Sequence, residues 1–384
     1  MADYAPMTPF LAPTDLTRAA GLARLAAAMP RLGQTYTQQR NYALAPGAPT
    51  TSLLSPWLRL RLLTEQEVIA ACVEAHGQAA DKFIQEVFWR TYFKGHLEQH
   101  PELWHEYRFG LSDAQERLGG NRGLARLYGQ AIGGETGLEC LDCWAQELVR
   151  TGWLHNHVRM WFASIWIFSL GLPWQLGADF FAQHLLDHDP ACNTLSWRWV
   201  AGLHTRGKPY IARAENIARY TQGRFNPVGE LEEAPSPLAE PDPLPPTILP
   251  PSDPWPRTAT ALLLHEEDLA PESLVPDHVH IVRIGVLASA TEASGLVRAA
   301  RATALADAAS RAEAAFDAPA TMLTSAGDIE EWAEGAPIAT PYAPVGPVAE
   351  LLAGLDLHRI QRAWDVHHWP HCARGFFQLR AKVA

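Results

Sequence analysis

Asp187-His-Asp-Pro-Ala-Cys-Asn-Thr-Leu-Ser-Trp-Arg-Trp199 brings two carboxylates, an amide and two indoles together within thirteen residues. Asp187 and Asp189 can accept hydrogen bonds from ring N–H or hydroxyl groups, and Asn193 can donate or accept one. The simpler alternative is that Asp-x-Asp-Pro only begins a helix or a turn, because aspartate favours both positions. The stretch therefore predicts a helix start, a site for a large aromatic redox cofactor, or both.

Several other stretches upstream carry polar and aromatic residues at positions that suit ligand binding. Thr51, Ser52 and Ser55 offer hydroxyl and backbone N–H groups just before a predicted helix, where the helix dipole favours a phosphate. A plain helix cap is the alternative. The remaining stretches are Tyr36-Thr-Gln-Gln-Arg40, Phe83-Ile-Gln-Glu-Val-Phe-Trp-Arg90, Thr136-Gly137 through Asp142, and Thr151-Gly-Trp-Leu-His-Asn-His-Val-Arg-Met160.

Two of these stretches place functional groups on one face of a helix. Glu86, Trp89 and Arg90 have i, i+3, i+4 spacing, so an acid, an indole and a guanidinium project together. The set Asn156, Arg159 and Met160 repeats that spacing. A lone tryptophan is usually a core residue, and that interpretation stands beside the functional one.

Taken together and in this order, these stretches resemble the photolyase/cryptochrome family over about residues 30 to 225. The resemblance implies FAD as the cofactor. Thr51-Ser-Leu-Leu-Ser-Pro56 resembles the family's phosphate-binding loop, Asp187 and Asp189 resemble the pair at the flavin ring edge and ribityl region, and Asn193 resembles the residue facing the flavin N5. The full set of cofactor-binding residues implied is Tyr36, Thr51, Ser52, Leu53, Leu54, Ser55, Arg90, Asn156, Arg159, Asp187, Asp189 and Asn193.

The resemblance also implies a substrate, a pyrimidine dimer in DNA. Family enzymes for cyclobutane dimers carry an asparagine at the position of Asn156, whereas those for (6-4) photoproducts carry a histidine, so we expect cyclobutane dimers. His157 departs from the family's usual arginine. The substrate-binding residues implied are Glu86, Trp89, Asn156, Met160 and Trp199, with Arg40 as a phosphate contact.

The catalytic residues implied are Glu86, Asn193, Trp197 and Trp174. Trp197 resembles the tryptophan nearest the flavin in the family's electron-transfer chain, and Trp174 resembles the middle one. Residues 105 to 143 contain no tryptophan, so the usual third donor is missing. Trp144, Trp153 or another aromatic residue completes the path, or flavin photoreduction is slow.

Two other functional classes remain open. A cryptochrome-like photosensor would bind FAD and signal without repair, although it would not need the dimer pocket that Glu86, Trp89 and Trp199 imply. A flavin-free scaffold would keep the fold only for protein contacts.

Composition limits the partners that are expected. The net charge is −11, but the residues up to Gly229 carry 21 basic and 20 acidic side chains, so the excess acid lies beyond them. A nearly neutral first part predicts few duplex-backbone contacts. We therefore expect a preference for dimers in single-stranded DNA, where flipping out a base costs less. The sequence contains no apolar segment long enough to predict a membrane span. We expect a cytoplasmic monomer.

Five cysteines give no disulfide framework, which fits a reducing compartment. Cys140 and Cys143 have a chelating spacing but no second pair, and a site formed by the C-terminal histidines with Cys372 is the weaker alternative. We expect no metal.

The order of elements predicts two domains. Residues 226–256 contain eleven prolines and form an extended linker in the prediction. The expected division is a helical FAD-binding domain over 1–228, a linker over 229–256 and a smaller Rossmann-like α/β domain over 257–384. In that last domain, strands are expected near 258–265, 278–287, 319–324 and 336–340, and helices at 295–316, 328–334 and 345–352. No motif there identifies an antenna chromophore, so the domain is either antenna-binding or structural.

Overall fold

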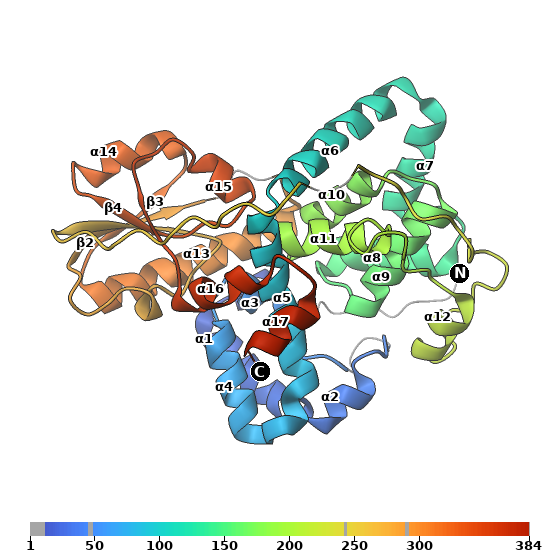
Figure 1. Ribbon diagram of the computed structural model, residues 1–384, viewed down its shortest axis with the longest axis horizontal. Helices are drawn as coiled ribbons and strands as arrows, with labels where there is room; N and C mark the ends of the chain where they lie inside the picture. Colours follow the sequence, from blue (N-terminus) through green and yellow to red (C-terminus); the bar gives the residue numbers. More distant parts are fainter. Residues whose placement is uncertain (1–11, 45–48, 242–243, 289–291, 384) are drawn as a thin grey trace.

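The computed structural model describes residues 12–44, 49–241, 244–288 and 292–383. Up to residue 220 the described chain is helical, as expected from its apolar periodicity (Figure 1). Its helices are α1 (Arg18–Ala28), α2 (Gln34–Gln39), α3 (Ser55–Arg59), α4 (Glu65–His76), α5 (Asp81–Gln99), α6 (Glu102–Gly120), α7 (Arg122–Gly133), α8 (Glu139–Thr151), α9 (Asn156–Ser164), α10 (Trp174–His184), α11 (Pro190–Val200) and α12 (Ala214–Tyr220).

A parallel five-stranded sheet with order β3-β2-β1-β4-β5 follows the proline-rich segment. This is the strand order of a doubly wound fold. Its elements are β1 (Thr260–His265), β2 (Ile281–Leu287), α13 (Gly295–Phe316), β3 (Ala320–Leu323), α14 (Ile329–Ala333), β4 (Ile338–Pro341), α15 (Pro347–Leu351), β5 (His358–Ile360), α16 (Ala363–His368) and α17 (Phe376–Val383). Four strands and three helices were expected; β5, α16 and α17 were not.

Alternating residues of β1 divide the sheet's two faces. Leu262 and Leu264 pack with α13, while Ala261 and Leu263 pack with α14 and α15. The cluster around α13 continues into α1, α4 and α5, so the sheet and the first helices share one hydrophobic core. A second core holds α6 to α12. The predicted division at 1–228, 229–256 and 257–384 stays a prediction.

The proline-rich segment runs in extended form along both parts of the molecule. The Thr247 N–H donates to the Gln99 carbonyl at the end of α5 (2.7 Å), and the Asp253 N–H donates to the Arg359 carbonyl in β5 (3.1 Å). The segment thereby covers the exposed edge of β5, which would otherwise present unpaired backbone groups.

Among the described residues, no helix is both long and apolar enough to span a bilayer.

Candidate functional site

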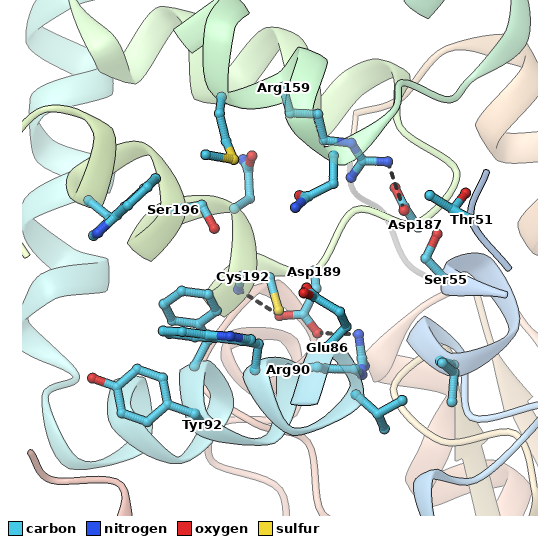
Figure 2. Close-up of a pocket in the computed structure, with 18 of the residues that line it drawn as sticks. Thr51, Ser55, Glu86, Arg90, Tyr92, Arg159, Asp187, Asp189, Cys192 and Ser196 are labelled. Atoms are coloured by element: carbon cyan, nitrogen blue, oxygen red, sulfur yellow. Dashed lines mark hydrogen bonds and ion pairs between the residues drawn. The ribbon is translucent and has the colours of Figure 1, made fainter. Parts of the chain in front are cut away.

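A cavity of about 710 Å³ lies among α3, α5, α9, α11 and α17. That volume falls in the ordinary range for cofactor and ligand pockets. All of the predicted site residues except Trp174 line it, namely Tyr36, Arg40, Thr51, Ser52, Leu53, Leu54, Ser55, Glu86, Trp89, Arg90, Asn156, Arg159, Met160, Asp187, Asp189, Asn193, Trp197 and Trp199. Figure 2 shows the labelled residues converging from separate elements.

Asp189 is both the N-cap of α11 and a wall of the cavity. One of its carboxylate oxygens accepts the Cys192 N–H at 2.9 Å, and the other lies 3.0 Å from Arg90 Nη1 and 3.8 Å from Lys94 Nζ (Figure 2). Burial alone would raise the pKa of Asp189, but Arg90 and Lys94 hold it well below its usual value. The cap interpretation is therefore confirmed, and the cap fixes the start of the helix that carries Asn193 and Trp197.

Asp187 has an oxygen available to a ligand. Its Oδ2 accepts a hydrogen bond from Arg159 Nη2 at 2.8 Å, whereas its Oδ1 is buried and has no hydrogen-bond partner among the described residues (Figure 2). A buried carboxylate oxygen without a donor is costly. The site therefore fits a group that brings an N–H or O–H donor to this position.

Asn193 is oriented by the backbone of α10. Its Nδ2 donates to the Ala178 carbonyl at 2.8 Å. Asn193 also lines the cavity, and its side-chain oxygen can accept a hydrogen bond from a ligand there.

The loop before α3 is shaped for close approach to a ligand. Leu53 has a positive φ of 58°, and the N-cap of α3 is Leu54, with no side chain capping the helix. Ser52 Oγ accepts the Leu54 N–H at 3.3 Å. Thr51 and Ser55 line the same cavity as Asp187. The helix-cap alternative is therefore wrong for these three hydroxyl residues.

Two further residues that line the cavity, Glu86 and Arg40, contact each other. Arg40 Nη1 lies 2.6 Å from Glu86 Oε1. Burial raises the pKa of Glu86, and the charge of Arg40 opposes that rise. These two residues were predicted to meet different parts of a substrate, and the structure places them side by side.

Each of the two predicted stacking indoles already has an aromatic neighbour. Trp89 stacks on Phe376 with ring centroids 3.8 Å apart and an interplanar angle of 7°, and Trp199 stacks on Tyr210 at 5.4 Å and 29°. Both indoles still line the cavity. They are therefore positioned as parts of rigid aromatic walls.

The aromatic residues behind Trp197 form more than one chain. Trp197 lies edge to face with Trp166, with ring centroids 6.4 Å apart. Position 177 requires glycine, because an added Cβ there would lie 2.3 Å from the Trp197 ring. Trp174 is buried away from the cavity and stacks on Tyr107 at 5.6 Å, which in turn lies 5.3 Å from Trp104. This second chain leads to α6.

The two tryptophans considered as the third electron donor, Trp144 and Trp153, belong to neither of these chains of aromatic contacts. Trp144 stacks on Trp161 at 5.7 Å, and Trp153 lines the cavity and lies 6.2 Å from His155.

The α/β part reaches the site through buried charges. Glu267, in the turn after β1, lies 2.6 Å from Arg59 and 3.3 Å from Lys94, and Lys94 is the residue that also faces Asp189. The carboxyl ends of the strands, where a doubly wound fold often binds a ligand, meet α3 and α5 here through these residues. The α/β part thus contacts the cavity wall at Asp189 through Glu267 and Lys94.

Sequence reasoning missed several lining residues. Ser196 and Cys192 lie in the opening stretch, and their helical phase relative to Asn193 could have identified them. Gly375, Phe376 and Phe377 come from the C-terminal segment, and no signal in the sequence links that segment to the cavity.

Metal ligands are not gathered in the described part of the chain, where no group of three or more His, Cys, Asp or Glu side chains could hold an ion. The five cysteines, all of which lie in the described part of the chain, form no disulfide bond.

Comparisons with known proteins give consistent matches. Residues 83–233 match the family model for the FAD-binding domain of DNA photolyase. The chain is 30% identical over 173 residues to a deoxyribodipyrimidine photo-lyase of Alkalihalophilus pseudofirmus, which covers 43% of this chain and 34% of that protein. It is 32% identical over 164 residues to the enzyme of that name from Streptomyces griseus, with coverage of 41% and 34%. Each match thus spans about a third of the relative's length.

A solved structure is also similar. The class III photolyase from Agrobacterium tumefaciens matches with a TM-score of 0.44 and 27% identity, covering 53% of this chain and 42% of that one.

Proposed function

Because this chain belongs to the photolyase/cryptochrome family, we propose that it is a light-dependent DNA repair enzyme that splits cyclobutane pyrimidine dimers. The observation that carries the proposal is the single cavity that brings the predicted cofactor residues and the predicted substrate residues together.

The cofactor is FAD, since the matched domain is the FAD-binding domain of DNA photolyase. The residues present fit it. Asp187 Oδ1 has no donor of its own, Asn193 offers an amide oxygen, and the uncapped start of α3 with Thr51 and Ser55 suits a phosphate. Reduced FAD, when bound, supplies an electron donor that light excites.

The protein's own groups then hold and orient the damaged bases. Trp89 and Trp199 offer aromatic surface for stacking, which is worth about 1–3 kcal/mol per base. Glu86, whose carboxylate pairs with Arg40, can accept a hydrogen bond from a base N–H group. Asn156 can hydrogen-bond a base edge, and Met160 contributes an apolar contact. Trp197 and Trp174 carry electrons to the cofactor for its photoreduction in this proposal.

The preferred substrate form in this proposal is single-stranded DNA. Support comes from the near balance of charge up to Gly229 and from an arginine, Arg40, whose charge is already paired with Glu86. Both features reduce the electrostatic contribution to duplex binding. We further propose that the protein works as a monomer in the cytoplasm; the described cysteines form no disulfide bond, which fits a reducing compartment.

The test is repair of a cyclobutane thymine dimer in matched single-stranded and duplex oligonucleotides by the reduced, FAD-loaded protein, under blue light and in darkness. Light-dependent repair of the single strand supports the proposal in full. Equal repair of the duplex would support the repair activity and contradict the preference for single-stranded DNA. Absence of repair with FAD bound would favour a photosensor.

A further inference from the structure

The C-terminal helix α17 forms part of the substrate side of the cavity. Gly375, Phe376 and Phe377 line it together with Trp89, and Phe376 is buried against the Trp89 indole. Since Trp89 is one of the residues proposed to stack a damaged base, α17 stands beside the position where the substrate enters.

α17 is held firmly in this place. Leu379 is fully buried, and Arg380 forms an ion pair with Asp81 at the start of α5 (2.7 Å). The Arg380 guanidinium also lies over the Phe88 ring, 5.1 Å from its centroid. The helix is therefore a fixed platform along α5, and its outward residues have defined positions relative to the cavity.

Phe377 is the feature that the fold itself does not explain. Its side chain is 78% exposed, yet it lines the cavity. Its neighbour Phe376 is edge to face with it at 5.6 Å, which leaves a phenyl face open to solvent. An exposed aromatic ring at the mouth of a ligand cavity is a recognition surface of the kind used by single-stranded nucleic acids.

The local charge points to the same partner. Residues 366–384 contain three basic residues and no acidic one, in a chain whose net charge is −11. Arg374, directly before the lining residue Gly375, is exposed. Lys208 is also exposed, in the loop that carries the lining residues His204 and Thr205. Aromatic surface flanked by cations is the pattern that tracks a strand's bases and phosphates.

We propose that α17 is a docking surface for the damaged DNA strand, in which Phe377 stacks on the base next to the dimer and Arg374 contacts the adjoining phosphate. This inference rests on the proposed function, because it places the dimer in the cavity. It extends the binding surface beyond the cavity to one flanking nucleotide, and it assigns a role to residues that sequence motifs did not identify.

The test compares binding of a labelled single-stranded oligonucleotide with one thymine dimer to the FAD-loaded wild type and to Phe377→Ala. The variant should bind about 5- to 150-fold more weakly, which corresponds to the loss of one stacked base. The Phe377→Tyr variant should keep wild-type affinity. Phe109→Ala is the matched control, because Phe109 is 79% exposed on α6 and does not line the cavity. Equal affinity of Phe377→Ala and Phe109→Ala would overturn the proposal.

Two further measurements separate this proposal from the proposed function. Arg374→Gln should reduce the slope of log Kd against log salt concentration by about 0.7, the value for one phosphate of a single strand; an unchanged slope would contradict the phosphate contact. Light-driven repair by the wild type of an isolated thymine-dimer dinucleotide, which has no flanking base, tests the proposed function separately from the α17 surface. If the wild type repairs the dinucleotide and Phe377→Ala binds the longer strand with wild-type affinity, the proposed docking surface on α17 is wrong, whereas the proposed repair activity is supported. If the wild type repairs neither substrate, the proposed function itself fails.

Discussion

Glu267→Gln should destabilise the protein strongly, because Glu267 joins the α/β part to the cofactor side of the cavity through two buried cations. Its carboxylate is nearly inaccessible and lies 2.6 Å from Arg59 and 3.3 Å from Lys94. Removing one partner of a buried ion pair costs about 3–5 kcal/mol. Glu266, 3.7 Å from Arg59, and Asp189, 3.8 Å from Lys94, remain as counter-charges, so we expect the lower end, about 3 kcal/mol.

The pKa of Glu267 gives the pH dependence of this effect. Burial alone would raise the pKa, but Arg59 and Lys94 lower it to about 2. Glu267 therefore stabilises the folded state above the unfolded pKa of about 4.3 and loses that contribution as the pH falls toward 2. The difference between wild type and Glu267→Gln should thus be full at pH 7 and shrink below pH ~4.3.

The assay is the free energy of unfolding from denaturant titrations followed by far-ultraviolet circular dichroism. Glu334→Gln is the matched control, because Glu334 forms an ion pair with Arg283 at a similar 2.7 Å but is 70% exposed. That variant should unfold at the wild-type midpoint, as exposed pairs contribute little. A Glu267→Gln midpoint equal to that of Glu334→Gln would refute the reasoning.

Three other changes have defined outcomes. Burial raises the pKa of Glu98 to about 7, although hydrogen bonds to its carboxylate oppose the rise, so the folded state holds a proton that the unfolded chain releases near pH ~4.3. The free energy of unfolding should therefore fall as the pH rises through 7. Glu98→Gln should remove that part of the pH dependence in unfolding titrations. Asp187→Asn should weaken FAD binding about 10- to 150-fold, the loss of a charged hydrogen bond, as measured by flavin fluorescence on titration; unchanged affinity would contradict the assignment of Oδ1 to the cofactor. Trp174→Phe should slow flavin photoreduction in absorbance traces, whereas Trp166→Phe should not; the reverse result would assign the path to the Trp197–Trp166 contact instead.

The sequence was sufficient to predict that the first part of the chain is mostly helical, because its apolar residues recur at helical spacing. The resemblance to the photolyase/cryptochrome family supplied about half of the residues that line the cavity. The i, i+3, i+4 sets on α5 and α9 face the same cavity as expected from their helical phase. The 295–316 helix was predicted at its observed bounds, since a long alanine-rich segment has few alternatives.

Long-range packing was beyond sequence reasoning. The stacking of Phe376 on Trp89 joins residues far apart in the chain, and neither residue type indicates the contact. The pairing of Glu86 with Arg40 is similar, because each was assigned to a substrate before the structure placed both on one side of the cavity. β5 was missed because a three-residue strand leaves too short a pattern to recognise.

The most direct measurement of the central claim is the excited-state lifetime of the reduced flavin in the FAD-loaded protein, alone and with saturating single-stranded oligonucleotide. If one cavity holds the cofactor and the damaged bases together, a strand containing a cyclobutane thymine dimer should shorten the lifetime, and the undamaged strand of the same sequence should not. An equal lifetime with both bound strands would contradict the account.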